Sequence, residues 1–451
     1  MNRVLLSSAA RALGLVVLTA GVLSGCAGSG TVPVTISGNL TGLASGTSIV
    51  LQDNNADNLT LTNNGSFTFS QEVTAGDPYS VTVLTQPLHQ VCSVTFGHGM
   101  ALDNGFGNTV TAVTVSCAAR PEYAYVANKG SNTVSQYAIG SGGVLTPMTP
   151  STVAAGGSPA SVTVDPTGQY AYVANSGDRT VSQYTIGASG ALTPIATASV
   201  AAGTTPFSVT VDPTGKYVYV ANEGDGTVSQ YTIGAGGALT PMATSTVATG
   251  NVPYFVTVDP SGKYAYVANY GSSDVSQYTI GAGGALIPMT PSAVASGSYP
   301  TSVTVDPSGK YAYVATGSGD VWQYTIGSGG ALTPMATTPT VAAGNAPYYS
   351  VTVDPSGKYA YVANQGDNSV SQYTIGSSGA LTPMTTSSVA AGTTPSSVTV
   401  DPTGQYVYVA NEGSGNVSQY TIGSNGALTP MTPSSVAAGN NPSSVVVAQP
   451  Q

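Results

Sequence analysis

Residues 209–234 read VTVDPTGKYVYVANEGDGTVSQYTIG, and closely similar stretches stand before and after them in the chain. The tyrosine that opens YVYVAN or YAYVAN recurs at successive spacings of 47, 47, 47, 47, 48 and 47 residues. A fixed period of this length indicates a repeat architecture in which each copy is one supersecondary unit. The seven tyrosines are Tyr123, Tyr170, Tyr217, Tyr264, Tyr311, Tyr359 and Tyr406.

Each copy contains four runs that read as short strands. The first, SVTVD, leads through Asp-Pro-Thr-Gly or Asp-Pro-Ser-Gly to the second, YVYVAN, and such a tetrapeptide is typical of a type I turn. The third run is TVSQYTIG and the fourth is ALTPM. Alternating β-branched and aromatic residues between Gly, Pro and Asn predict strands. Seven four-stranded units predict an all-β protein with a seven-bladed β-propeller over residues 120–451.

The two ends of the repeat region predict how the ring closes. Tyr123 begins the second strand of a copy whose first strand is missing before it, and the chain ends in SSVVVAQPQ, a first strand without a second. We expect residues 444–448 to complete the blade that contains Tyr123. Closure of this kind protects the strand edges that an open ring would expose.

The repeat resembles that of a known family. The pattern YVANxGxxTVSQYTIGxxGxLTPM after VDPxGKY is similar to the YVTN-type repeat of bacterial lactonase-like propellers, a group with enzymes similar to 6-phosphogluconolactonase and 3-carboxymuconate cyclase. The resemblance covers about residues 120–451 and implies charged and imidazole side chains at the mouth of a central channel. From residue 120 onward the chain has no histidine, so no catalytic residue is carried over from the family.

Most basic residues of the ring share one position, directly after the Asp-Pro-x-Gly turn, where two copies have glutamine instead. A position filled by either lysine or glutamine indicates a solvated turn and not a catalytic site. The residues concerned are Lys216, Lys263, Lys310 and Lys358, with Gln169 and Gln405 in the other two copies.

Composition excludes some partners. Charged residues make up 6% of the chain, the net charge is −10, and Lys and Arg together number nine. Nucleic-acid binding needs a basic stripe and binding to acidic lipid needs a basic cluster, so neither is expected. We expect a monomer with no cofactor and no metal.

The N-terminus resembles a bacterial lipoprotein leader. Residues 1–25 combine Arg3 and Arg11 with an apolar run that is too short for a membrane span. The following LSGC resembles a lipobox, which implies cleavage before Cys26, acylation of Cys26 and an anchor linker over residues 26–32. Ala27 favours the outer membrane of a Gram-negative cell envelope by the same analogy. The alternative is a plain secretory peptide with a chance cysteine.

Residues 33–118 alternate as strands in a different style and resemble Ig-like or carboxypeptidase-regulatory-like β-sandwiches. Asn-Gly at residues 64–65 predicts a hairpin turn. In an exported protein Cys92 and Cys117 are expected to form a disulfide. A zinc site with His89 and His98 is the weaker alternative, since the spacing fits no zinc pattern, and the two histidines are then surface residues.

The copies differ mainly in the loop after YVAN and in the loop before each first strand. In a propeller these loops emerge on one face, so variation there indicates a recognition surface. Filling of gaps between blades is the alternative role for the rings in these loops. The aromatic residues that we expect to bind a ligand are Phe207, Tyr254, Phe255, Tyr299, Tyr348 and Tyr349.

Two further features of the repeats are expected to have structural and not functional roles. Asp178, Asp225 and Asp367 follow YVAN and could bind calcium, but the loops lack the carboxylate density of calcium loops. Trp322 replaces a serine of VSQY beside a shortened loop and is expected to fill space there.

Two functions follow from the sequence. The first is an envelope-anchored, non-enzymatic propeller that binds a glycan, a peptide or an envelope protein, or that serves as a display scaffold. The alternative is a lactonase or cyclase-type enzyme with an unfamiliar site.

Overall fold

The computed structural model describes residues 32–102, 109–345 and 350–450. The chain divides into two compact units, Met1–Pro87 with Cys92–Cys117, and Leu88–Val91 with Ala118–Gln451. The short segment Leu88–Val91 joins the second unit because the N–H of Arg120 donates to the carbonyl of His89 at 2.9 Å. The leader, Cys26 and the linker up to residue 31 lie outside the described residues. Among the described residues, no helix has the length and apolar composition needed to cross a membrane.

The first unit is a β-sandwich of two four-stranded sheets, with strand orders β4-β1-β8-β6 and β3-β2-β5-β7. Apolar side chains such as Ile36, Leu51 and Phe67 point between the sheets and form one core. Its strands are β1 (Pro33–Thr41), β2 (Ile49–Asp53), β3 (Asp57–Leu61), β4 (Gly65–Thr74), β5 (Pro78–Thr85), β6 (Gln90–Thr95), β7 (His98–Met100) and β8 (Thr109–Ala119).

The disulfide prediction is confirmed and the hairpin prediction is wrong. Cys92 and Cys117 are bonded and join β6 to its neighbour β8. The Asn-Gly pair does not turn a hairpin, because β3 and β4 belong to different sheets. Asn64 instead exchanges two hydrogen bonds of 2.8 Å with the backbone of Leu43, which fixes the crossover between the sheets.

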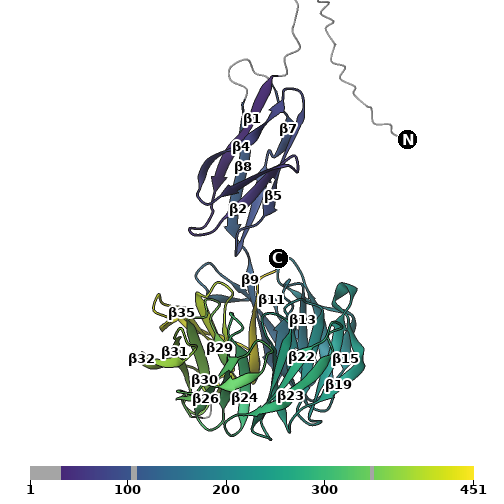
Figure 1. Ribbon diagram of the computed structural model, residues 1–451, viewed down its shortest axis with the longest axis vertical. Helices are drawn as coiled ribbons and strands as arrows, with labels where there is room; N and C mark the ends of the chain where they lie inside the picture. Colours follow the sequence, from purple (N-terminus) through teal and green to yellow (C-terminus); the bar gives the residue numbers. More distant parts are fainter. Residues whose placement is uncertain (1–31, 103–108, 346–349, 451) are drawn as a thin grey trace, which may run out of the picture. The chain divides into compact units, whose positions relative to one another are not determined.

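The second unit is the predicted propeller, with seven blades that close into a ring. Its strands run from blue through teal and green to yellow in Figure 1. In each blade the first strand lies innermost and the next three follow outward. The first blade has β37 (Pro442–Ala448), β9 (Glu122–Asn128), β10 (Thr133–Ile139) and β11 (Leu145–Ala154); the second has β12 (Pro159–Val164), β13 (Tyr170–Asn175), β14 (Thr180–Ile186) and β15 (Leu192–Ala201); and the third has β16 (Pro206–Val211), β17 (Tyr217–Asn222), β18 (Thr227–Ile233) and β19 (Leu239–Ala248), with the 3-10 turn η1 (Ala235–Gly237) before β19. The fourth blade has β20 (Pro253–Val258), β21 (Tyr264–Asn269), β22 (Asp274–Ile280) and β23 (Leu286–Ala295), and the fifth has β24 (Pro300–Val305), β25 (Tyr311–Thr316), β26 (Asp320–Ile326), β27 (Leu332–Pro334) and β28 (Thr340–Ala342). The sixth blade has β29 (Val351–Val353), β30 (Tyr359–Asn364), β31 (Ser369–Ile375) and β32 (Leu381–Ala390), and the seventh has β33 (Pro395–Val400), β34 (Tyr406–Asn411), β35 (Asn416–Ile422) and β36 (Leu428–Ala437).

Ring closure occurs as the sequence predicts. The C-terminal strand β37 pairs antiparallel with β9, so that the first blade has the order β11-β10-β9-β37. The yellow end of the chain lies against β9 in Figure 1, although more than 300 residues separate Asn128 from its partner Pro442. The two ends of the propeller sequence therefore share one sheet.

The uniform residues of the repeat hold each blade to the next. At the interface of the third and fourth blades, the Tyr219 hydroxyl donates to the carbonyl of Gly284 at 2.6 Å, and Gln230 accepts from the N–H of Leu286 at 2.7 Å. In the opposite direction the Tyr278 hydroxyl donates to the carbonyl of Ala248. The same three bonds recur at every interface and form three closed rings around the propeller.

The outer strands differ from the sequence prediction. Six of them run for ten residues, well past ALTPM, and only in the fifth blade is the strand split into β27 and β28. There Trp322 stands where six blades have a serine that binds the asparagine of YVAN. Its ring packs against the buried cluster of that blade, and its Nε1 has no partner among the described residues. Trp322 therefore fills space, as expected.

Candidate functional site

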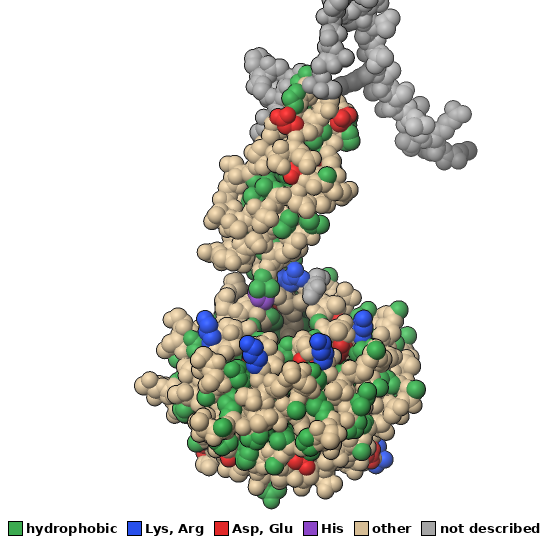
Figure 2. Space-filling model, viewed as in Figure 1, with side chains coloured by type: hydrophobic (Ala, Val, Ile, Leu, Met, Phe, Trp, Pro, Cys, Tyr) green, Lys and Arg blue, Asp and Glu red, His purple; other side chains and the backbone are tan. Residues whose placement is uncertain are grey.

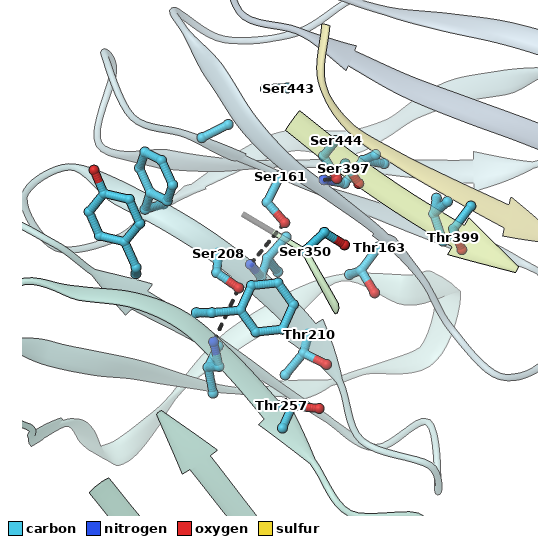
Figure 3. Close-up of a pocket in the computed structure, with 18 of the residues that line it drawn as sticks. Ser161, Thr163, Ser208, Thr210, Thr257, Ser350, Ser397, Thr399, Ser443 and Ser444 are labelled. Carbon is cyan, nitrogen blue, oxygen red and sulfur yellow. Dashed lines mark hydrogen bonds between the residues drawn. The ribbon is translucent and has the colours of Figure 1, made fainter. Parts of the chain in front are cut away.

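A cavity of about 250 Å³ occupies the channel at the centre of the ring. It is lined by the first strands of the blades, which contribute mainly serine, threonine and valine (Figure 3). No charged side chain is among the described residues that line it. The pattern SVTV places alternate residues on the same side of each strand, so serine and threonine form two successive tiers along the channel.

The upper tier, here called the serine belt, ties the inner strands together. The hydroxyl of Ser161 accepts from the N–H of Val209 in the next blade at 3.3 Å, and four more serines do the same. These bonds satisfy N–H groups on inner strand edges that no further strand covers. The belt serines are Ser161, Ser208, Ser302, Ser350, Ser397 and Ser444, and Phe255 takes the remaining position.

Ser350 differs from the other belt serines because its hydroxyl donates to the carbonyl of Val398 at 3.0 Å. Phe255 interrupts the belt, since it offers no acceptor to the fifth blade, and its ring packs against the buried cluster of that blade. Phe255 was expected in the aromatic group at the mouth, but it lines the channel.

The residue after YVAN occupies an equivalent place at the channel mouth in each regular blade. In five of these blades its N–H donates to a carbonyl of the loop before the first strand, for example Lys129 to Asn441 and Glu223 to Thr205, both at 2.9 Å. This bond fixes the backbone, so only the side chain varies from blade to blade. The residues at this position are Lys129, Ser176, Glu223, Tyr270, Gln365 and Glu412, all half-buried.

Charged groups therefore do gather at the mouth. Lys129 and Glu412 line one small recess together with Phe207. Glu223 stands two blades from Lys129. Burial raises the pKa of the Glu223 carboxyl, and the nearby positive charge of Lys129 lowers it in part. A carboxyl whose pKa is raised toward neutral is suited to accept and return a proton.

An aromatic row of four rings extends along the same face. Phe207 lies 4.4 Å from Tyr254 between ring centroids, Tyr254 stacks on Tyr270 at 4.8 Å, and Tyr270 lies 4.9 Å from Tyr299. Tyr299 is 51% exposed and the other three are half-buried. The structure thus brings together three of the six aromatic residues that the sequence singled out. Tyr348 and Tyr349 lie outside the described residues.

Four residues of this site were not predicted from the sequence. Tyr270 completes the aromatic row, and Lys129, Glu223 and Glu412 supply charge at the mouth, although the sequence indicated only that the loop after YVAN varies. The signal was present, because all four share the position after YVAN. The composition does not reveal this signal, because the number of charged residues does not say which of them lie close together.

The repeated aspartates are used by turns, as the sequence predicts. Oδ1 of Asp212 accepts the N–H groups of Lys216 and Tyr217 at 2.8 Å, and its Oδ2 accepts that of Thr214 at 3.0 Å. The lysines after these turns are exposed. Figure 2 shows Lys and Arg side chains spaced singly over the visible face of the propeller, without a basic patch there.

The aspartates considered for calcium binding also accept hydrogen bonds from backbone N–H groups of a neighbouring loop. Asp225 accepts the N–H of Thr204, and this hydrogen bond lowers its pKa. Ser272 and Ser414 make the corresponding bond in other blades, so the position requires an acceptor and not a charge. Within the described ranges, no group of three or more His, Cys, Asp or Glu could hold a metal ion.

Each of the two histidines has a polar side chain as its neighbour. His98 is exposed and its Nδ1 lies 2.9 Å from the Ser80 hydroxyl. His89 was expected at the surface, but it is half-buried, and its Nδ1 lies 2.7 Å from Oε1 of Gln449.

Comparison with known proteins agrees with this architecture. The family model described as lactonase, 7-bladed beta-propeller, matches residues 97–199 and 126–447. The chain belongs to this lactonase family. A search of curated proteins gives no match.

Solved structures of this lactonase fold are similar over most of their length. A putative 6-phosphogluconolactonase from Bacteroides fragilis is 22% identical, covers 73% of this chain and 98% of its own, and has a TM-score of 0.65. The periplasmic gluconolactonase PpgL of Pseudomonas aeruginosa is 20% identical over 73% and 99% of the two chains, with a TM-score of 0.62. The hydrazine synthase of Kuenenia stuttgartiensis, 22% identical over 66% and 91% with a TM-score of 0.52, has the same fold. Likeness at this level establishes the fold and not the reaction.

Proposed function

We propose that the propeller is a lactone hydrolase whose active site is the channel mouth. The proposal is supported by the family of the propeller and by three charged residues at the position after YVAN: Lys129 and Glu412, which line one recess, and Glu223, whose pKa Lys129 lowers in part. Ester hydrolysis needs a general base for water and a positive group for the developing oxyanion. Glu223 and Lys129 provide these two kinds of group.

The reaction is assigned to these residues as follows. The Glu223 carboxylate takes a proton from water while the water oxygen bonds to the lactone carbonyl carbon. The Lys129 ammonium stabilises the negative charge on the carbonyl oxygen. The ring C–O bond then breaks, the leaving alkoxide takes the proton from Glu223, and an open-chain hydroxy acid remains.

The test is hydrolysis of δ-gluconolactone by the purified protein, measured above the uncatalysed rate at constant pH. Glu223→Gln keeps the shape of the side chain and removes the base, so we expect a loss of about 100-fold or more in kcat/KM. Lys216→Gln is the matched control, because glutamine stands at the same turn position in two other blades. The proposal is contradicted if the wild-type protein does not exceed the uncatalysed rate. It is also contradicted if Glu223→Gln has the same kcat/KM as the wild type.

A second candidate is binding without catalysis, and the aromatic row favours it. Its rings are preorganised by mutual stacking, and aromatic anchors often dominate binding energy. Phe207→Ser with Tyr254→Ser should abolish binding to a glycan or peptide array, and Ser396 shows that serine is tolerated at this position. If the rings only fill gaps, the double variant melts early and array binding is unchanged.

Export and lipidation at Cys26 remain part of the proposal. A disulfide supports an oxidising compartment, where such bonds persist. The intact mass of the mature protein should show an acylated N-terminal cysteine, and an unmodified N-terminus contradicts the anchor.

A further inference from the structure

The channel below the mouth has a composition that the proposed reaction does not require. Beneath the serine belt lies a threonine tier, with one threonine in six blades and Val446 in the seventh. The threonines are Thr163, Thr210, Thr257, Thr304, Thr352 and Thr399, all half-buried and all lining the cavity. Figure 3 shows labelled members of both tiers arranged around this cavity.

Many of these hydroxyl groups retain hydrogen-bonding capacity. Ser208 is 2% exposed, and its oxygen accepts a backbone N–H, while no acceptor for its own proton is found among the described residues. Five of the threonine hydroxyls, all except that of Thr399, have no hydrogen-bond partner in the described part of the chain. Polar groups in a confined space are normally satisfied by a partner, and here that partner must be water or a ligand.

The chemistry of the lining restricts the ligand. An apolar molecule would leave the hydroxyls unsatisfied, a metal cation would need carboxylates, and a phosphorylated molecule would need cations. The described lining has none of these charges, and at the mouth Glu223 and Glu412 outnumber Lys129. Phe255 and Val446 each add an apolar side chain to the lining, against which the C–H groups of a sugar can pack.

We propose that the channel binds an uncharged, polyhydroxylated molecule, and that the substrate class of the mouth is accordingly sugar lactones without a phosphate group. The statement about substrates rests on the proposed hydrolase, whereas the binding site does not. The hydroxyl groups of the ligand exchange hydrogen bonds with the two tiers, and its reactive end faces the mouth. A volume of about 250 Å³ accommodates one small sugar together with water.

Binding is tested with sorbitol, which cannot be hydrolysed, and with sorbitol 6-phosphate, both titrated calorimetrically into the full-length protein. The variant carries Thr163→Val, Thr210→Val and Thr257→Val, which preserve side-chain shape and remove three hydroxyls. Val446 shows that a blade accepts valine at this position. The control carries three equal changes at exposed outer-strand positions, Thr193→Val, Thr240→Val and Thr382→Val.

We expect the wild type and the control to bind sorbitol, and the channel variant to bind it about tenfold or more weakly, as the loss of several hydrogen bonds implies. Sorbitol 6-phosphate should bind more weakly than sorbitol to the wild type. Equal sorbitol affinity of variant and wild type, absence of sorbitol binding, or tighter binding of the phosphate overturns the inference. A melting temperature equal to that of the control shows that the variant is folded. Sorbitol binding without lactone hydrolysis overturns only the proposed reaction.

Discussion

Glu122→Gln should remove a pH-dependent loss of stability from the propeller. Glu122 is 8% exposed at the start of β9, where it accepts a hydrogen bond of 2.9 Å from Nε2 of Gln449. Burial raises its pKa from 4.5 to about 7, and the negative charge of Asp401 adds to the effect. Other blades have Gln169 and Gln405 at the same position, so glutamine suits this site.

The direction in which stability changes with pH follows from the protons bound by the folded and unfolded states. Between about pH 4.5 and pH 7 the folded protein keeps a proton on Glu122 that the unfolded chain has released, so the free energy of unfolding falls as pH rises through this window. A shift from 4.5 to about 7 corresponds to an upper limit of about 3.4 kcal/mol. Partial contact with water reduces this to about 1–2 kcal/mol.

The measurement is urea unfolding at pH 5 and pH 8, followed by the fluorescence of Trp322. Because Trp322 is the one tryptophan of the chain, the signal reports on the propeller alone. Wild type should lose about 1–2 kcal/mol more than Glu122→Gln between the two pH values. Comparing the two proteins cancels the contributions of all other titrating groups. Equal pH dependence in both proteins refutes the assignment of a raised pKa to Glu122.

Three further predictions concern the scaffold. Deleting residues 443–451 should remove β37 and expose the edge of β9, so we expect loss of solubility or of cooperative melting, and a truncated protein that melts like the full chain contradicts the closure. Tyr219→Phe should lower the free energy of unfolding by about 1–3 kcal/mol, because the carbonyl of Gly284 loses its hydroxyl donor, and no change in urea unfolding would assign that bond no energetic role. Val252→Asn should raise stability by about 0.5–1 kcal/mol, because Val252 has φ of +56° and Asn441 already holds the same position at +52°; a lower melting temperature would count against this.

The fold could be predicted from the sequence because each repeat carries its own turn and strand signals. The period of the tyrosines gave the number of blades, and the incomplete first and last copies gave the closure. The function of Tyr219 and Gln230 was not predictable, because their partners Gly284 and Leu286 lie in the next blade and only the packed ring brings them together. The outer strands were predicted too short, because the residues that follow LTPM, rich in serine, threonine and alanine, resemble a loop.

The site was only partly predictable for the same reason. Variation after YVAN pointed to the mouth, but the raised pKa of Glu223 and its relation to Lys129 depend on burial and on blade order. At Asn64 a local signal gave the wrong prediction. The Asn-Gly pair favours a hairpin, but the hydrogen bonds of Asn64 to Leu43 fix a crossover to the other sheet. Local propensity gives way where a side chain satisfies distant backbone groups.

The proposed function is tested most directly by comparing kcat/KM for δ-gluconolactone with kcat/KM for its 6-phosphate on the same wild-type preparation. We expect hydrolysis of the uncharged lactone well above the uncatalysed rate and weaker activity on the phosphate. The described channel lining carries no cation, and Lys129 at the mouth is accompanied by two carboxyl groups, those of Glu223 and Glu412. Preference for the phosphorylated lactone, or no hydrolysis of either, would contradict it.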